Sequence, residues 1–124
     1  MSIDVIVPES AKKTYDGWHF APAVRHENLV FFSGVVGHGE TVEDEFRDAW
    51  QSLAITLKEA GLGYEDIIDT TLYVVGLQEH AGTMAKVKDE FIKAPYPAST
   101  WIGVSELIYP GAHAEIKVTA RITT

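Results

Sequence analysis

Two side chains near the C-terminus of the sequence could carry out acid–base chemistry. His113 and Glu115 are two residues apart in a segment that alternates apolar and polar residues, so in a strand both project from one face. A carboxylate beside an imidazole could position water or act as a general acid or base, and the imidazolium could instead bind an acidic ligand. The pair could also belong to a solvated polar face whose charges pair across strands. The pattern alone favours this second interpretation.

Nucleophilic and metal chemistry have less support. Neither Ser33 nor Ser99 lies in a G-x-S-x-G motif, and no base is fixed beside either, so both hydroxyls are predicted to be structural. Gly34 after Ser33 indicates a close backbone approach within a strand. The chain has no cysteine, and its histidines lack the spacing that sets metal ligands on one face: His19, His26, His38, His80 and His113. We expect neither a metal nor a cofactor.

Composition bounds the class of protein. The 124 residues are 46% hydrophobic and 23% charged, which is typical of one globular domain, and we expect a single domain over residues 1–124. A net charge of −8 disfavours nucleic acid and anionic lipid as partners. The sequence shows neither a leader pattern nor an apolar run near the ~20 residues of a membrane span. We therefore expect a cytoplasmic protein with no membrane partner.

An α+β domain must position these residues. Apolar residues recur at helical spacing after Thr41 and end at Gly61, which predicts a well-defined helix over residues 41–60. A weaker stripe predicts a second helix over 79–93. Alternating or β-branched segments predict strands over residues 2–7, 18–24, 29–36, 67–75, 99–107 and 112–122. The expected order is β-β-β-α-β-α-β-β, in a mixed sheet.

Both predicted helices lie in β-α-β units, whose crossovers are right-handed, so both should cover the same face of the sheet. The other face would then be bare. Phe31 or Phe32, and one set of alternate residues in 72–75, must point to it. An exposed apolar patch of this kind marks an interaction surface, so the pattern predicts a homo-oligomer.

Several short blocks of sequence occur together and in order: FFSG at 31–34, LKEAGL at 57–62 and DIIDTTLYV at 66–74. Pro97-Ala98, Leu107 and Glu115-Ile116 follow with suitable spacing. From about residue 15 to 122 the chain resembles the Rid (YjgF) family, also labelled L-PSP endoribonucleases. The resemblance implies a chorismate-mutase-like fold and a homotrimer with inward sheet faces and ligand clefts between subunits.

The resemblance also implies an activity. Family members often hydrolyse reactive enamines or imines such as 2-aminoacrylate, with an arginine that grips the substrate carboxylate and an acid that positions water. Glu115 matches the acid, and Ser33 and Gly34 are retained. Ser99 stands in the position of the arginine, and serine supplies neither the charge nor the planar fork.

Three further positions depart from the family pattern. Trp101 replaces a cysteine common in the deaminases, Phe20 replaces a tyrosine, and Met84 replaces an asparagine. The candidate ligand-binding residues are therefore Phe20, Ser33, Gly34, Met84, Ser99 and Trp101, with Glu115 and His113 as candidate catalytic residues. The aromatic members could equally fill the core or a subunit contact.

Three functions follow from the resemblance and its departures. The first is hydrolysis of a small enamine, imine or related metabolite at a trimer interface, without the usual arginine. The second is a non-catalytic metabolite-binding or interaction trimer. The third is the endoribonuclease activity, which the net charge disfavours.

Overall fold

The computed structural model describes residues 4–123, so Ser2 and Ile3, the start of the first expected strand, lie outside the described residues. The helices are α1 (Lys12–Trp18), α2 (Val42–Glu59) and α3 (Leu77–Lys88), with short 3-10 turns at Glu9–Ala11 and Tyr64–Asp66. The strands are β1 (Asp4–Ile6), β2 (Ala23–His26), β3 (Leu29–Phe32), β4 (Val35–Val36), β5 (Ile67–Val75), β6 (Ala98–Val104) and β7 (Ala114–Arg121).

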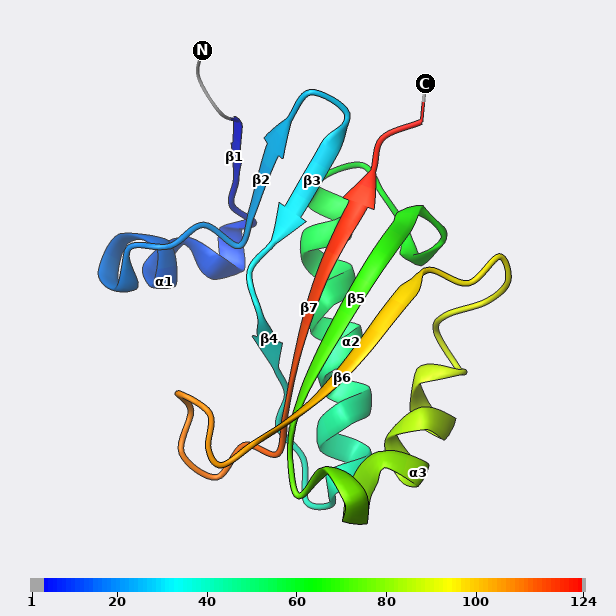
Figure 1. The fold of residues 1–124 in the computed structure, drawn as a ribbon. Coiled ribbons are helices and arrows are strands. Elements are labelled where there is room, and N and C mark those ends of the chain that lie inside the picture. The colour runs from blue at the N-terminus through cyan, green and yellow to red at the C-terminus, as the bar shows by residue number, and fades with distance from the viewer. Residues whose placement is uncertain (1–3, 124) are drawn as a thin grey trace.

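Within residues 4–123 the strands form one mixed sheet in the order β1-β2-β3-β7-β5-β6, with β4 also paired to β7 (Figure 1). β5 and β6 run parallel and are joined through α3, whereas the other pairs are antiparallel. The predicted α+β class and the order of the main elements are confirmed.

The helix α2 forms where the capping pattern and the apolar stripe predict it. Thr41 Oγ1 accepts a hydrogen bond from the Asp44 backbone N–H at 3.0 Å, and acidic residues fill the first turn, where they complement the helix dipole. Gly61, with φ of 77°, follows the helix end. The apolar stripe of α2 is buried against the sheet: Phe46, Ala49, Trp50, Leu53 and Leu57.

The two main helices cover one face of the sheet. α2 lies behind the central strands and α3 contacts α2 beside it (Figure 1). Leu72 pairs in register with both Ile116 and Trp101, so these three side chains share the helix-covered face. Tyr73 pairs with Glu115, and both therefore belong to the opposite face.

That opposite face, here called the open face, carries no helix among the described residues. Phe31 projects from it with 46% of its surface exposed, and Ile102 and Tyr73 extend the same face along β6 and β5. Phe32 is the alternate residue and is buried in the hydrophobic core. The bare face expected from the pattern of apolar residues is therefore present in the single chain.

The N-terminal region differs from the expectation. Residues 12–18 form α1, and the expected strand over 18–24 is shifted to β2, starting at Ala23. No residue of α1 is buried, so the helix has no apolar stripe that could have indicated it. Its end at His19, with φ of 60°, turns the chain toward β2.

Other strand and helix boundaries also differ from the predicted ones. The single strand expected over 29–36 is divided into β3 and β4 at Ser33 and Gly34. α3 begins and ends earlier than the predicted 79–93, and β6 ends at Val104 rather than at 107. Residues 105–113 consequently form a long loop before β7. None of the helices among residues 4–123 has the length and apolar character that crossing a membrane requires.

Candidate functional site

A pocket of about 300 Å³ brings together three of the predicted ligand-binding residues: Phe20, Ser33 and Gly34. It lies between the N-terminal segment, the β3–β4 junction and α2, which contributes Thr56. The remaining lining residues are Ser10, Ala11, Thr14, Pro22, Phe32, Val35 and Val36. No lining side chain is charged, so the pocket offers hydroxyl groups and apolar walls.

Glu115 lies directly beside Gly34. A Cβ added at residue 34 would be 2.6 Å from Glu115 Cδ and still closer to one carboxylate oxygen. Only glycine at residue 34 therefore leaves room for the Glu115 carboxylate in its observed position. This contact explains in steric terms why the Ser33-Gly34 pair interrupts the strand.

The Glu115 carboxylate is half-buried but uncommitted. No hydrogen bond or ion pair within residues 4–123 involves it. Tyr73 is its neighbour across the strand pair on the open face. A carboxylate in this position retains all its acceptor capacity for water or a ligand.

Ser33 fixes the segment that carries Phe20. Its Oγ donates to the Ala21 carbonyl oxygen at 2.6 Å, and its backbone N–H donates to the Pro22 carbonyl oxygen at 2.9 Å. The hydroxyl proton is thus already used, although the oxygen can still accept a hydrogen bond. The prediction of a structural hydroxyl agrees with this geometry.

His113 pairs with Glu45, and the side-by-side pair of His113 and Glu115 considered above does not form. Glu45 Oε2 accepts the His113 backbone N–H at 2.6 Å, and Glu45 Oε1 lies 2.8 Å from His113 Nδ1. Glu45 is only 7% exposed, whereas His113 is half-buried. The reason is geometric, since His113 precedes β7 and its ring reaches the first turn of α2.

Sequence reasoning missed Glu45. It occupies the first helical turn four residues before the buried Ala49, so its side chain falls on the edge of the apolar stripe. A carboxylate on a buried helix face needs a hydrogen-bond donor. This requirement is the feature of the sequence that could have indicated Glu45, although it does not identify His113 as the donor.

The remaining predicted ligand-binding residues lie elsewhere in the chain. Ser99 and Trp101 pair with Thr70 and Leu72, which places them on the helix-covered side of β6, and Trp101 packs against the core. Met84 is fully buried in the core, where no ligand reaches its side chain. Within one chain, these three residues thus do not reach the pocket lined by Phe20, Ser33 and Gly34, here called the Gly34 pocket. The structure gives Met84 no support as a ligand contact.

The part of the chain that the structure describes contains no group of three or more histidine, aspartate or glutamate side chains arranged to hold a metal ion. The Gly34 pocket itself offers hydroxyl groups and apolar surface, and the Glu115 carboxylate lies against Gly34 without being one of the lining residues.

Comparison with known proteins places this geometry in a family. Residues 13–122 match the family model described as endoribonuclease L-PSP. The chain is 36% identical to the RutC family protein YjgH of Escherichia coli (strain K12), over 94% of this chain and 93% of that protein. It is 23% identical to a 2-iminobutanoate/2-iminopropanoate deaminase of Dermatophagoides farinae, over 71% of this chain and 74% of that one.

A solved structure agrees with the fold over almost the whole chain. Rv2704 of Mycobacterium tuberculosis, described as a member of the YjgF/YER057c/UK114 family, superposes with a TM-score of 0.87 at 26% identity, covering 98% of this chain and all of the other. The expected YjgF-like fold is confirmed. Together with the match over residues 13–122, this shows that the chain belongs to the Rid (YjgF) family, whose model is described as endoribonuclease L-PSP.

Proposed function

We propose that the chain hydrolyses a small imine or enamine at a cleft completed by a second subunit, with Glu115 positioning the attacking water. The observation that carries this proposal is the half-buried, uncommitted Glu115 carboxylate packed against Gly34, beside the pocket lined by Phe20 and Ser33. A relative named as a 2-iminobutanoate/2-iminopropanoate deaminase supports the reaction class.

The reaction needs one group that can take a proton and return it, and Glu115 is the candidate. Water adds to the imine carbon as Glu115 takes its proton, which forms the carbon–oxygen bond. The same carboxyl group returns the proton to nitrogen, which gives the carbinolamine. Glu115 then takes the hydroxyl proton and passes it to the nitrogen as the carbon–nitrogen bond breaks, which releases ammonia and leaves a carbonyl product. An enamine substrate must first gain a proton on carbon to become the imine.

A homotrimer would complete the site. The open face exposes Phe31 and Ile102, and burying such apolar surface between subunits is favourable. Ser99 and Trp101 lie on the other side of the sheet from Glu115, so any contribution from them to the same cleft must come from another copy. Ser99 in place of the family's arginine indicates a substrate held without a bidentate grip on its carboxylate.

The catalytic part of the proposal is tested by Glu115→Gln. We expect the rate of 2-iminopropanoate hydrolysis to fall about 100-fold, because the amide cannot accept the proton. Glu59→Gln, an exposed change at the far end of α2, is the matched control and should retain the wild-type rate. Background rates in both the wild type and Glu115→Gln would eliminate the deaminase proposal.

The assembly is tested by Phe31→Glu with Ile55→Glu as control. Both residues are about half-exposed, but Phe31 lies on the open face and Ile55 on α2. Light scattering should give a trimer for the wild type and the control, and smaller species for Phe31→Glu. A monomeric wild type in dilute solution would contradict the proposed trimer.

A second function, ligand binding without turnover, is favoured by the Ser33 hydroxyl, whose proton is already bound, and by the uncharged pocket. It predicts that a metabolite raises the melting temperature without being consumed, because a ligand selective for the native state stabilises it. An endoribonuclease activity has less support at a net charge of −8 and requires salt-sensitive RNA binding in a mobility-shift experiment.

A further inference from the structure

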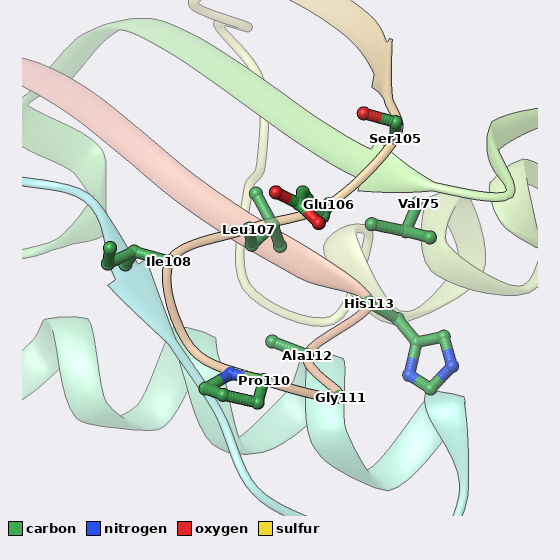
Figure 2. A pocket seen from close by; sticks show the side chains of 9 residues that line it. All are labelled: Val75, Ser105, Glu106, Leu107, Ile108, Pro110, Gly111, Ala112 and His113. Carbon is green, nitrogen blue, oxygen red and sulfur yellow. The ribbon is translucent and has the colours of Figure 1, made fainter.

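A second cavity, of about 630 Å³, lies under the loop that joins β6 to β7 (Figure 2). Its walls are Val75, Ser105, Glu106, Leu107, Ile108, Pro110, Gly111, Ala112 and His113. It shares no lining residue with the Gly34 pocket. Glu115 does not line it either.

His113 lines this cavity with one ring nitrogen fixed and the other unused. A carboxylate has only acceptors, so the 2.8 Å contact to Glu45 requires the hydrogen on His113 Nδ1. In the neutral imidazole this leaves Nε2 as a hydrogen-bond acceptor. Because the second Glu45 oxygen also binds the His113 backbone N–H, the ring is held at two points.

The other walls define what the cavity can hold. Val75 points toward Glu106 and Leu107 from β5, and Ile108 and Pro110 continue the wall along the loop (Figure 2). The lining is mostly apolar, with one carboxylate at Glu106 and no lysine or arginine. An anion would be repelled by Glu106, whereas a cation would be attracted to it.

We propose that this cavity binds a small primary amine with an apolar body. The ammonium group pairs with the Glu106 carboxylate and the apolar part packs against Val75 and Leu107, whereas the ring of His113 is turned away from Glu106 (Figure 2). The nearby His80, whose ring centre lies 5.5 Å from that of His113, is itself within 3.6 Å of Glu79, so the surroundings add a further carboxylate.

Three probes that share a phenyl body test the proposal: 2-phenylethylamine, 2-phenylethanol and 3-phenylpropanoate. Titrations of the full chain followed by amide nuclear magnetic resonance should show shifts confined to residues near 105–113. The amine should bind about fivefold more tightly than the alcohol, which is the ratio that an exposed ion pair of about 1 kcal/mol gives. The carboxylate should bind most weakly.

Three variants separate the contributions. Glu106→Gln should reduce amine binding to the level of the alcohol and leave alcohol binding unchanged. His113→Asn, whose amide can still donate to Glu45, should leave both affinities unchanged, because the His113 ring is turned away from Glu106. Glu59→Gln removes an exposed carboxylate outside the cavity and should change neither.

Several outcomes would overturn the proposal. Equal affinity for all three probes would show that charge has no role in binding. Shifts centred on Gly34 would show that the probes bind in the other pocket. Absence of shifts with every probe in folded wild-type protein would mean that the cavity is filled by a neighbouring subunit or is too open to bind.

Discussion

Two glutamates of this chain lie in opposite situations. Glu45, on α2, is buried and both of its oxygens accept hydrogen bonds from His113. Glu115, on β7, is half-buried beside Gly34 and has no hydrogen bond or ion pair with any described residue. Burying a carboxylate is costly unless donors compensate for lost water. The first arrangement therefore stabilises the fold, whereas the second leaves a carboxylate available for chemistry.

Gly37, which lies against Glu45, and Gly34, which lies against Glu115, have correspondingly different surroundings. A Cβ at Gly37 would meet backbone, including the Glu45 carbonyl oxygen and the Ala49 nitrogen at 2.5 Å, whereas the three atoms nearest to a Cβ at Gly34 all belong to the Glu115 side chain. Backbone in a helix can move only with the whole element. A side chain, by contrast, can rotate away. Gly37 therefore preserves the packing of α2, whereas Gly34 preserves the position of the Glu115 carboxylate.

The largest effect is expected for Gly37→Ala. The added methyl group forces α2 away from the sheet, and we expect a loss of about 3 kcal/mol in the free energy of unfolding. Urea denaturation measures it. Gly82→Ala, within α3 and with no atom near the added methyl, is the control and should stabilise the protein by about 0.5 kcal/mol. A neutral Gly37→Ala would show that α2 is not held as closely as described.

The next effect concerns Glu45 itself. Glu45→Ala leaves the part-buried His113 N–H without its acceptor, and we expect a loss of about 2 kcal/mol of stability. Glu45→Gln retains one acceptor oxygen and should recover part of the loss. Glu115→Ala is the comparison, with an expected change within about 0.5 kcal/mol. Equal losses for Glu45→Ala and Glu115→Ala would remove the distinction between the two carboxylates.

A smaller effect is expected for Tyr64, another polar group committed to α2. Its hydroxyl donates to the Trp50 carbonyl oxygen at 2.6 Å, and partial burial raises the pKa of Tyr64 above its ordinary value. Tyr64→Phe should cost about 1 kcal/mol at neutral pH. A raised pKa stabilises the fold below the unfolded value, so the wild type should lose this contribution as pH rises beyond about 10. The phenylalanine variant should lack that alkaline component in pH-dependent thermal melts.

The sequence predicted elements that have strong periodicity. The stripe of α2 and the alternation of β7 each identify an element with one buried face, and burial of that face stabilises the element. The helix α1 has no buried residue, so no pattern could indicate it. Strand and helix ends moved for the same reason, since loops such as 105–113 are fixed by tertiary contacts.

The candidate site could be predicted only in part. The adjacency of Ser33, Gly34 and Glu115 followed from motifs of the resembled family, and the structure brings Gly34 and Glu115 into contact. The side of β6 to which Trp101 points depends on the register of β6 against β5, which alternation on an edge strand does not encode. The partner of His113 required the spatial approach of α2 to β7, across 68 residues of sequence.

The smallest effect on stability, and the sharpest test of the comparison, is Gly34→Ala. The methyl group must displace the Glu115 side chain, which can rotate, so we expect a loss below about 1 kcal/mol, well short of the loss for Gly37→Ala. Displacement should nevertheless lower imine hydrolysis as much as Glu115→Gln does, and combining the two changes should add little. Equilibrium unfolding and initial rates measured on the same samples provide both quantities. If Gly34→Ala retained full activity in folded protein, the close packing of Gly34 and Glu115 would have no part in positioning water, and the carboxylate would act from another orientation.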